Sequence, residues 1–118
     1  KEGKGAFIED YVKTNYQGKI LSRNWGDKYN FIIELFTPET NKGNALKYVA
    51  ETLGFNREDI IAFGDGHNDI EMLEYAGIGV AMRNAHEELL EVADYISPYT
   101  NQENAIEQYL DTFFKKFK

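Results

Sequence analysis

The sequence predicts an α/β fold in which helices flank a parallel sheet. Two observations support this prediction. From residue 41 onward, segments with helical periodicity alternate with short apolar runs, as in parallel sheets whose strands are connected by helices. The runs at 60–63 and 78–82 are apolar almost throughout, which is typical of strands that are buried on both faces of a sheet.

The first part of the chain follows a different pattern. Segments 19–24 and 29–36 have the residues of strands, and a Gly-Asp pair between them favours a turn, so two strands are expected here. Segment 6–16 fits a helix or a strand, and the sequence does not decide between them. Pro38 then breaks the pattern.

In the second part, helices are expected where apolar residues recur three or four positions apart. They cover 45–53, 68–76, 86–92 and 106–117, and a short strand is expected at 95–96. The apolar face of the first helix consists of Ala45, Leu46, Val49, Ala50 and Leu53. Gly54 is a typical end for that helix. Thr100 and Glu103 have the spacing of a capping box, so we expect them to begin the last helix.

Composition indicates a folded, soluble domain. The 118 residues fit one domain of ordinary size, and 42% of them are hydrophobic, which is enough for a core. The net charge of -7 disfavours binding to nucleic acid or to anionic membranes, because both attract cationic surfaces. The sequence has no cysteine, and no segment has the pattern of a signal peptide or a membrane span. A cytoplasmic protein is therefore expected.

Two acids follow the first apolar run. Asp65 and Asp69 stand four residues apart, and Gly64 and Gly66 allow the backbone to bend tightly beside them. Loops at the carboxyl ends of parallel strands are where such sheets bind ligands. Two neighbouring carboxylates repel each other unless a cation or a proton lies between them, and Mg²⁺ with phosphate oxygens suits that requirement. The alternative is a solvated turn whose acids cap the next helix.

Three other motifs are excluded by their spacing. A calcium-binding loop that begins at Asp65 would need glycine at its sixth position and glutamate at its twelfth, where the sequence has Ile70 and Ala76. Neither of the two G-x-G segments has the third glycine of a dinucleotide-binding fingerprint. A zinc site needs more ligands than His67 and His86 provide, so each histidine is expected to be a surface or capping residue.

Two further polar residues stand at the ends of predicted elements. Lys42 lies at the start of the first helix, where a cation is unfavourable unless it shares an anion such as phosphate with the helix N-terminus. A plain surface lysine is the alternative. Asn84 follows the run 78–82 at the same edge of the sheet, where it either caps the next helix or contacts a ligand.

Together these segments resemble a known family. NKGNALKYVAETLG, IIAFGDGHNDIEMLEYAGIGVAM and ADYIS, followed by a terminal helix, are similar to the C-terminal part of haloacid-dehalogenase-superfamily phosphatases of the Cof type. The resemblance extends from about residue 31 to the end of the chain. It implies that residues 1–38 are the end of an α+β cap domain, which covers the substrate. Residues 39–118 would be the second half of a Rossmann-like catalytic core.

The resemblance also implies roles for five side chains. The lysine of the Lys-Gly pair, here Lys42, is a catalytic residue that binds the phosphoryl group and screens its charge. The first aspartate of the G-D-x-x-N-D motif, Asp65, ligates Mg²⁺. The second, Asp69, supports the metal site or orients the lysine. Asn68 contacts the substrate phosphate, and Asn84 is a further candidate for phosphate binding.

Arg83 departs from the family's pattern, which usually has glycine at this position. A bulky cation there would narrow the site or add a phosphate contact, and it puts the role of Asn84 in question.

The nucleophile motif of the family, D-x-D-G-T, has no counterpart here, because the sequence contains no D-x-D. We therefore expect a fragment that supplies the lysine and part of the Mg²⁺ site and has no phosphatase activity alone. The family's central strand would also be missing, so the strand at 60–63 should have an unpaired edge. Such an edge favours self-association.

The resemblance implies a Mg²⁺-dependent phosphatase for the whole protein. It would hydrolyse small phosphorylated metabolites, sugar phosphates among them, through an aspartyl-phosphate intermediate. The main alternative is a non-catalytic, truncated or degenerate relative that acts as a binding or structural module. A nucleotide-binding module is a more distant alternative.

Overall fold

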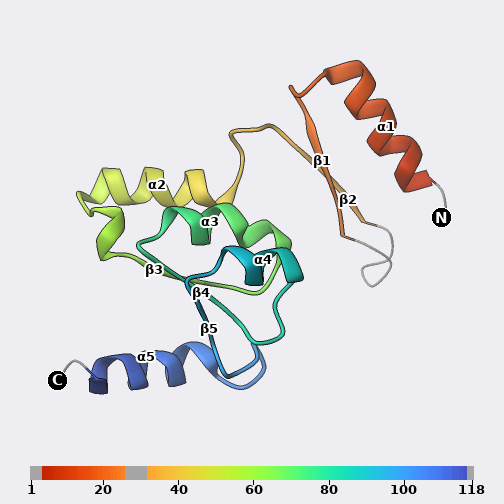
Figure 1. Cartoon of the computed structure of the whole chain (residues 1–118). Coiled ribbons are helices and arrows are strands. Elements are labelled where there is room, and N and C mark those ends of the chain that lie inside the picture. Colours follow the sequence, from red (N-terminus) through yellow and green to blue (C-terminus); the bar gives the residue numbers. More distant parts are fainter. Residues whose placement is uncertain (1–3, 26–31, 117–118) are drawn as a thin grey trace. The chain divides into compact units, whose positions relative to one another are not determined.

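The structure, a computed structural model, describes residues 4–25 and 32–116 and divides into two units at residues 40 and 41. The predicted α/β fold is confirmed (Figure 1). Within the described residues, no helix has both the length and the apolar character needed to cross a membrane.

The first unit contains one helix and one strand pair. Helix α1 (Lys4–Tyr16) settles the open choice for segment 6–16 in favour of a helix. Strands β1 (Leu21–Asn24) and β2 (Ile33–Phe36) are antiparallel, so both predicted strands exist but are shorter than expected. The predicted Gly-Asp turn falls outside the described residues.

The second unit is built on a parallel sheet of three strands. They are β3 (Ile61–Gly64), β4 (Ile78–Ala81) and β5 (Tyr95–Ile96), in the spatial order β3-β4-β5. Because the strands are parallel, the loops after β3, β4 and β5 emerge at the same edge of the sheet.

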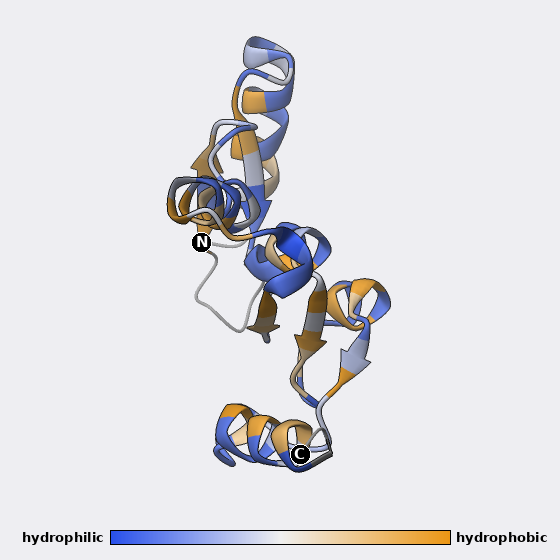
Figure 2. Ribbon diagram, turned by 90° about the vertical axis from the view of Figure 1, so that its left-hand side faces the viewer, coloured by the Kyte–Doolittle hydropathy of each residue, from blue (hydrophilic) through white to orange (hydrophobic). Residues whose placement is uncertain are grey.

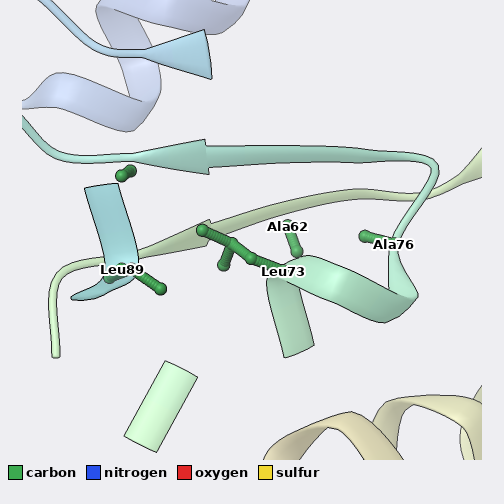
Figure 3. Packing of buried hydrophobic residues seen from close by; sticks show 5 residues of the cluster. Ala62, Leu73, Ala76 and Leu89 are labelled. Atoms are coloured by element: carbon green, nitrogen blue, oxygen red, sulfur yellow. The ribbon is translucent and has the colours of Figure 1, made fainter. Parts of the chain in front are cut away.

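Helices cover the sheet on both faces. Figure 1 shows α2 (Lys42–Leu53), α3 (Ile70–Tyr75) and α4 (Glu87–Val92) on one side and α5 (Ala105–Lys116) on the other. The buried core on the first side consists of Ala62, Leu73, Ala76, Ala81 and Leu89 (Figure 3). On the second side, the ring of Phe63 packs edge-on against Tyr109 of α5, with ring centroids 5.5 Å apart. Successive residues of β3 thus face opposite layers, as the alternation of side chains along a strand requires.

The distribution of hydrophobic residues agrees with a sheet that is covered by helices on both faces. Figure 2 shows that β3 and β4 are mostly hydrophobic and that hydrophobic and hydrophilic residues alternate along the helices. Strand β3 pairs only with β4, so in the described part of the chain its other edge is unpaired, as predicted.

Helix α2 differs from its prediction in the face that it buries. Gly43 and Ala50 are buried and Leu46 is partly buried, whereas the side chains of Val49 and Leu53 are 50% and 64% exposed. The predicted apolar face is therefore only half covered within this unit, because α3 contacts one side of it. Gly54 ends the helix as predicted, with a φ of 78° that favours glycine.

The last helix spans nearly its predicted range of 106–117, but it does not begin at the predicted capping box. Thr100 and Glu103 bond to each other through their side chains, Oγ1 to Oε1 at 2.9 Å, but they lie in a turn that precedes α5. The capping box is therefore wrong as a helix start. Glu103 is instead engaged in a tertiary ion pair with Arg83.

Candidate functional site

Asp69 is the most enclosed polar group of the loop that follows β3. It ends a short 3-10 helix (His67–Asp69), and only 3% of its surface is exposed. Its Oδ2 accepts hydrogen bonds from the backbone amides of Asp65, at 3.0 Å, and Gly66, at 3.1 Å. Its Oδ1 accepts from Nζ of Lys42 at 2.5 Å. Both carboxylate oxygens are thus occupied, and the carboxylate fixes the curvature of its own loop.

The environment of Asp69 favours its ionised form. Burial alone would raise the pKa of its carboxyl group. The hydrogen bond from Lys42, the two backbone amides and the charge of Lys42 outweigh burial and lower that pKa below its ordinary value. Asp69 is therefore a carboxylate at neutral pH.

Lys42 reaches Asp69 because α2 packs very closely on α3. The side chain of Asn41 caps the helix by accepting a hydrogen bond from the amide of Asn44 at 2.8 Å. A Cβ atom at Gly43 would lie 2.5 Å from the carbonyl oxygen of Glu71, so only glycine permits this approach. The glycine after the lysine thus sets the position of the ammonium group, which stays half exposed beside the loop.

Gly64 has a similar function at the end of β3. A Cβ atom there would lie 2.6 Å from Cβ of Asp69, so the missing side chain makes room for this buried acid. At Gly66 the nearest atom to such a Cβ would be Oδ1 of Asn68, at 2.8 Å. Asn68 therefore lies over the turn beside Asp65, as expected for a residue of the same loop.

The carboxylate of Asp65 is exposed and is linked to the other two loops at this edge of the sheet. Its Oδ2 accepts a hydrogen bond from Nδ2 of Asn101 at 2.7 Å. Asn101 is bonded twice to Asn84, as an acceptor from Nδ2 at 3.1 Å and as a backbone donor to Oδ1 at 3.3 Å. Within the described residues, Oδ1 of Asp65 has no hydrogen bond.

Residues 83–86 include the cap of α4 and an ion pair with the turn before α5. The interpretation of Asn84 as a helix cap is wrong, because the cap of α4 is His86, whose Nδ1 accepts from the amide of Glu88 at 3.3 Å. His86 was expected to be a surface or capping residue, and the structure shows that it is a cap. The guanidinium of Arg83 pairs with Glu103 at 2.9 Å, so its charge is directed to the turn before α5.

His67 completes the rim of the site. Its Nε2 lies 2.7 Å from Oε2 of Glu88, and its ring lies 4.9 Å from that of His86. These contacts join the loop after β3 to the start of α4.

The donor set fits part of a magnesium site. Carboxylate oxygens suit Mg²⁺, which takes six oxygen ligands in octahedral geometry. Asp65 offers a free oxygen, whereas both oxygens of Asp69 are already occupied. Over residues 4–25 and 32–116, no group of three or more His, Cys, Asp or Glu residues could hold a metal ion.

Hydrogen bonds join four of the predicted site residues, and the backbone amide of Asp65 links Asp65 to Asp69. Lys42 and Asp69 contact each other directly, and Asp65 and Asn84 are joined through Asn101. Asn101 is not among the residues that the sequence predicts for the site, because the sequence pattern of Thr100 and Glu103 on either side of it is that of a helix cap. A signal was available, since Asn101 follows β5 at the carboxyl edge where the other two loops lie.

Comparison with known proteins identifies relatives that match between 65% and 94% of this chain. A 5-amino-6-(5-phospho-D-ribitylamino)uracil phosphatase from Bacillus subtilis is 36% identical over 107 residues, which are 91% of this chain and 39% of that protein. A phosphoglycolate phosphatase from Methanothermobacter thermautotrophicus is 43% identical over 77 residues, which are 65% of this chain and 35% of that protein. The crystal structure of a haloacid dehalogenase-like hydrolase from Bacteroides thetaiotaomicron matches with a TM-score of 0.78 and 35% identity, over 94% of this chain and 40% of that one.

The chain spans 35% to 40% of the length of these three relatives. The fold of the Bacteroides thetaiotaomicron hydrolase confirms the parallel, Rossmann-like sheet flanked by helices. A family model described as haloacid dehalogenase-like hydrolase matches residues 2–110. The chain therefore belongs to the haloacid dehalogenase-like hydrolases.

Proposed function

We propose that this chain is the C-terminal part of a Mg²⁺-dependent phosphatase that hydrolyses small phosphorylated metabolites. The observation that carries the proposal is the ion pair between Lys42 and buried Asp69, which holds an ammonium group beside the exposed carboxylate loop. A fixed cation beside a carboxylate suits the binding of a phosphoryl group whose charge is shared with a metal. The two curated relatives described above are both named phosphatases.

Each side chain has a proposed role in this function. Asp65 would ligate Mg²⁺ through Oδ1, and the ion when bound would neutralise phosphate charge. Asp69, the other candidate metal residue, would support that site by holding Lys42 and the loop in place, since both of its oxygens are occupied. Lys42 would bind the phosphoryl group through the donors that Asp69 leaves free. Asn68 and Asn84 would bind phosphate oxygens.

We further propose that residues 1–38 are the end of a cap domain and that residues 39–118 are the second half of the catalytic core. The division of the structure at residues 40 and 41 agrees with this assignment. The nucleophile would then come from a segment that pairs with the free edge of β3, and water would hydrolyse the aspartyl-phosphate. A cytoplasmic location and self-association of the isolated chain through that edge belong to the same proposal.

The names of the relatives suggest the class of substrate. One acts on a phosphorylated ribityl compound and the other on phosphoglycolate, so both are named for small phosphate monoesters. We propose a small phosphate monoester, a sugar phosphate among the candidates, as the substrate here.

A chimera tests the proposal. This chain replaces the matching 39% of the Bacillus subtilis phosphatase, which supplies the remainder of the fold. We expect Mg²⁺-dependent release of phosphate from that enzyme's named substrate, a loss of at least about 100-fold in kcat for Asp65→Asn, and a smaller loss for Asp69→Asn. The isolated 118-residue chain should show no turnover.

Gln102→Ala is the matched control, because Gln102 is exposed and lies in the turn beside Asn101. A folded chimera in which Asp65→Asn retains full activity would refute the proposed role of the acidic loop. A folded chimera with no activity would favour the non-catalytic alternative.

A further inference from the structure

The side chain of Asn101 contacts the one site carboxylate that is exposed. Asp65 is held at the backbone, where its carbonyl oxygen accepts from the amide of His86 at 2.9 Å. Its carboxylate would rotate freely about χ1 and χ2 if nothing else bonded to it, as exposed aspartates do. The 2.7 Å hydrogen bond from Nδ2 of Asn101 to Oδ2 is the only hydrogen bond to that carboxylate among the described residues.

Asn101 can restrain Asp65 only if it is itself fixed, and bonds to its side chain, to its backbone and within its turn hold it. Asn84 bonds to it twice, once through each end of its own amide. The amide of Arg83 donates to the carbonyl oxygen of Tyr99 at 3.0 Å, which joins the two loops two residues away. The guanidinium of Arg83 and the hydroxyl of Thr100 both bond to Oε1 of Glu103, which closes the turn around Asn101.

We propose that Asn101 is a positioning residue that holds the Asp65 carboxylate in one rotamer for metal binding. Its amide occupies Oδ2 as a donor, so Oδ1 is left for the metal ion. Arg83 and Asn84 act through Asn101: they fix the loop after β5 onto the loop after β4. The departure from glycine at position 83 therefore adds an anchor for Glu103.

Partners of this kind usually alter metal affinity by 10-fold or more when they are removed, because they orient the ligating group. The inference rests on the proposed function, since it assumes that Asp65 ligates a metal ion. The first test of the inference is a structural measurement that requires neither a bound metal ion nor an enzyme assay.

The first test measures the rotamer of Asp65 in the 118-residue chain by NMR. Three-bond couplings from the Asp65 carboxyl carbon to its backbone nitrogen and carbonyl carbon report χ1. We expect values of a single rotamer in the wild type and in Gln102→Ala, and averaged values in Asn101→Ala and Asn101→Asp. Asn101→Asp keeps an acceptor for Asn84 and replaces the donor to Asp65 with a carboxylate that repels it. Averaged couplings in the wild type, or the wild-type rotamer in both Asn101 variants, would overturn the proposal.

The second test measures binding of Mn²⁺, used in place of Mg²⁺, from paramagnetic broadening of backbone signals in residues 64–69. We expect the apparent Kd to rise about 10-fold in Asn101→Ala and to remain at the wild-type value in Gln102→Ala. An unchanged Kd in Asn101→Ala would overturn the role in metal binding.

The two proposals fail in different ways. If Asp65→Asn leaves broadening by Mn²⁺ unchanged, the proposed function fails at its metal site, whatever the couplings show. If Asp65→Asn abolishes specific broadening while the Asn101 variants behave as the wild type, the metal site stands and the positioning role of Asn101 is refuted.

Discussion

A single buried carboxylate organises the site. Asp69 accepts from Lys42 and from two backbone amides, so it connects α2 to the loop after β3. Its ionised form is stabilised by these donors, which is why its pKa is lowered in spite of burial. At the scale of the residue, the fold and the site thus depend on the same group, and pH should affect both.

Stability should decrease at acidic pH in a way that depends on Asp69. Because the folded-state pKa of Asp69 is lowered, its contribution is fully present above the unfolded pKa of about 3.9 and is lost as the pH falls through the lower folded-state value. We expect Asp69→Asn to lower the free energy of unfolding by about 1–3 kcal/mol at pH 7 and this difference to disappear in acid. Urea unfolding followed by circular dichroism over a pH series measures it.

Glu74→Gln is the control for that series, because Glu74 lies on the exposed side of α3. It should retain the pH dependence of the wild type. A difference between Asp69→Asn and the wild type that stays constant down to the acid transition would contradict the assigned role.

Gly64 provides a second prediction at this scale. A methyl group there would meet Cβ of Asp69 at 2.6 Å and Cδ1 of Leu73 at 3.0 Å, both in the interior. We expect Gly64→Ala to lower the free energy of unfolding by about 1–3 kcal/mol through overpacking. Gly66→Ala should cost less, because its methyl group would meet only the movable end of Asn68. Equal losses in the two variants, measured by urea unfolding, would be inconsistent with this geometry.

At the scale of elements, local patterns predicted most of the second unit. The strands at 61–64 and 78–81 differ from their predicted bounds by one residue at most at each end, because a short apolar run between helical segments has few other interpretations. The prediction failed where tertiary contacts decide. Glu103 forms an ion pair with Arg83, which is 20 residues away in sequence, and it lies in the turn before α5 instead of capping that helix.

In the site, too, local sequence patterns predict some residues, whereas tertiary contacts determine others. The acids at 65 and 69 were found because the strand, the glycines and the acids are adjacent in sequence. Asn101 was not found, because it reaches Asp65 across 36 positions through the order of strands in the sheet. The sequence likewise does not predict which residues of the apolar face of α2 are buried. Periodicity identifies the face, but the packing of α3 against the helix decides which part of that face is covered.

Helix α5 should depend on one aromatic contact with the sheet. Phe63 of β3 and Tyr109 of α5 pack edge to face, an arrangement worth about 0.5–1.5 kcal/mol beyond the area that it buries. A double-mutant cycle with Phe63→Ala and Tyr109→Ala should show a coupling energy in that range by urea unfolding. A coupling energy of zero would show that α5 is held in place by other contacts.

At the scale of the whole molecule, the second unit has more apolar surface than its own elements cover. Val49 and Leu53 of α2 are largely exposed, and the outer edge of β3 is unpaired within the described residues. Surfaces of this kind favour association, because they offer apolar area and backbone hydrogen bonds to a partner. The isolated chain is therefore expected to associate with itself.

Sedimentation velocity tests this expectation. The weight-average sedimentation coefficient of the wild type should rise with protein concentration over the micromolar range. Val49→Lys should reduce the rise, because it places a charge on the exposed apolar face at little cost to folding. Gln102→Lys adds the same charge away from this face and should behave as the wild type. A monomer at every concentration would refute self-association.

The loop that carries Asp65 begins where the edge strand β3 ends. Any strand that pairs with β3 in parallel therefore has its carboxyl end beside the same loop. A phosphorylated ligand that contacts groups from both strands binds the paired state and not the separated one. Pairing and ligand binding then form a thermodynamic cycle, in which each increases the equilibrium constant of the other by the same factor. A higher ligand concentration would thus increase the fraction of molecules in which the further strand is paired with β3, as well as the occupancy of the site.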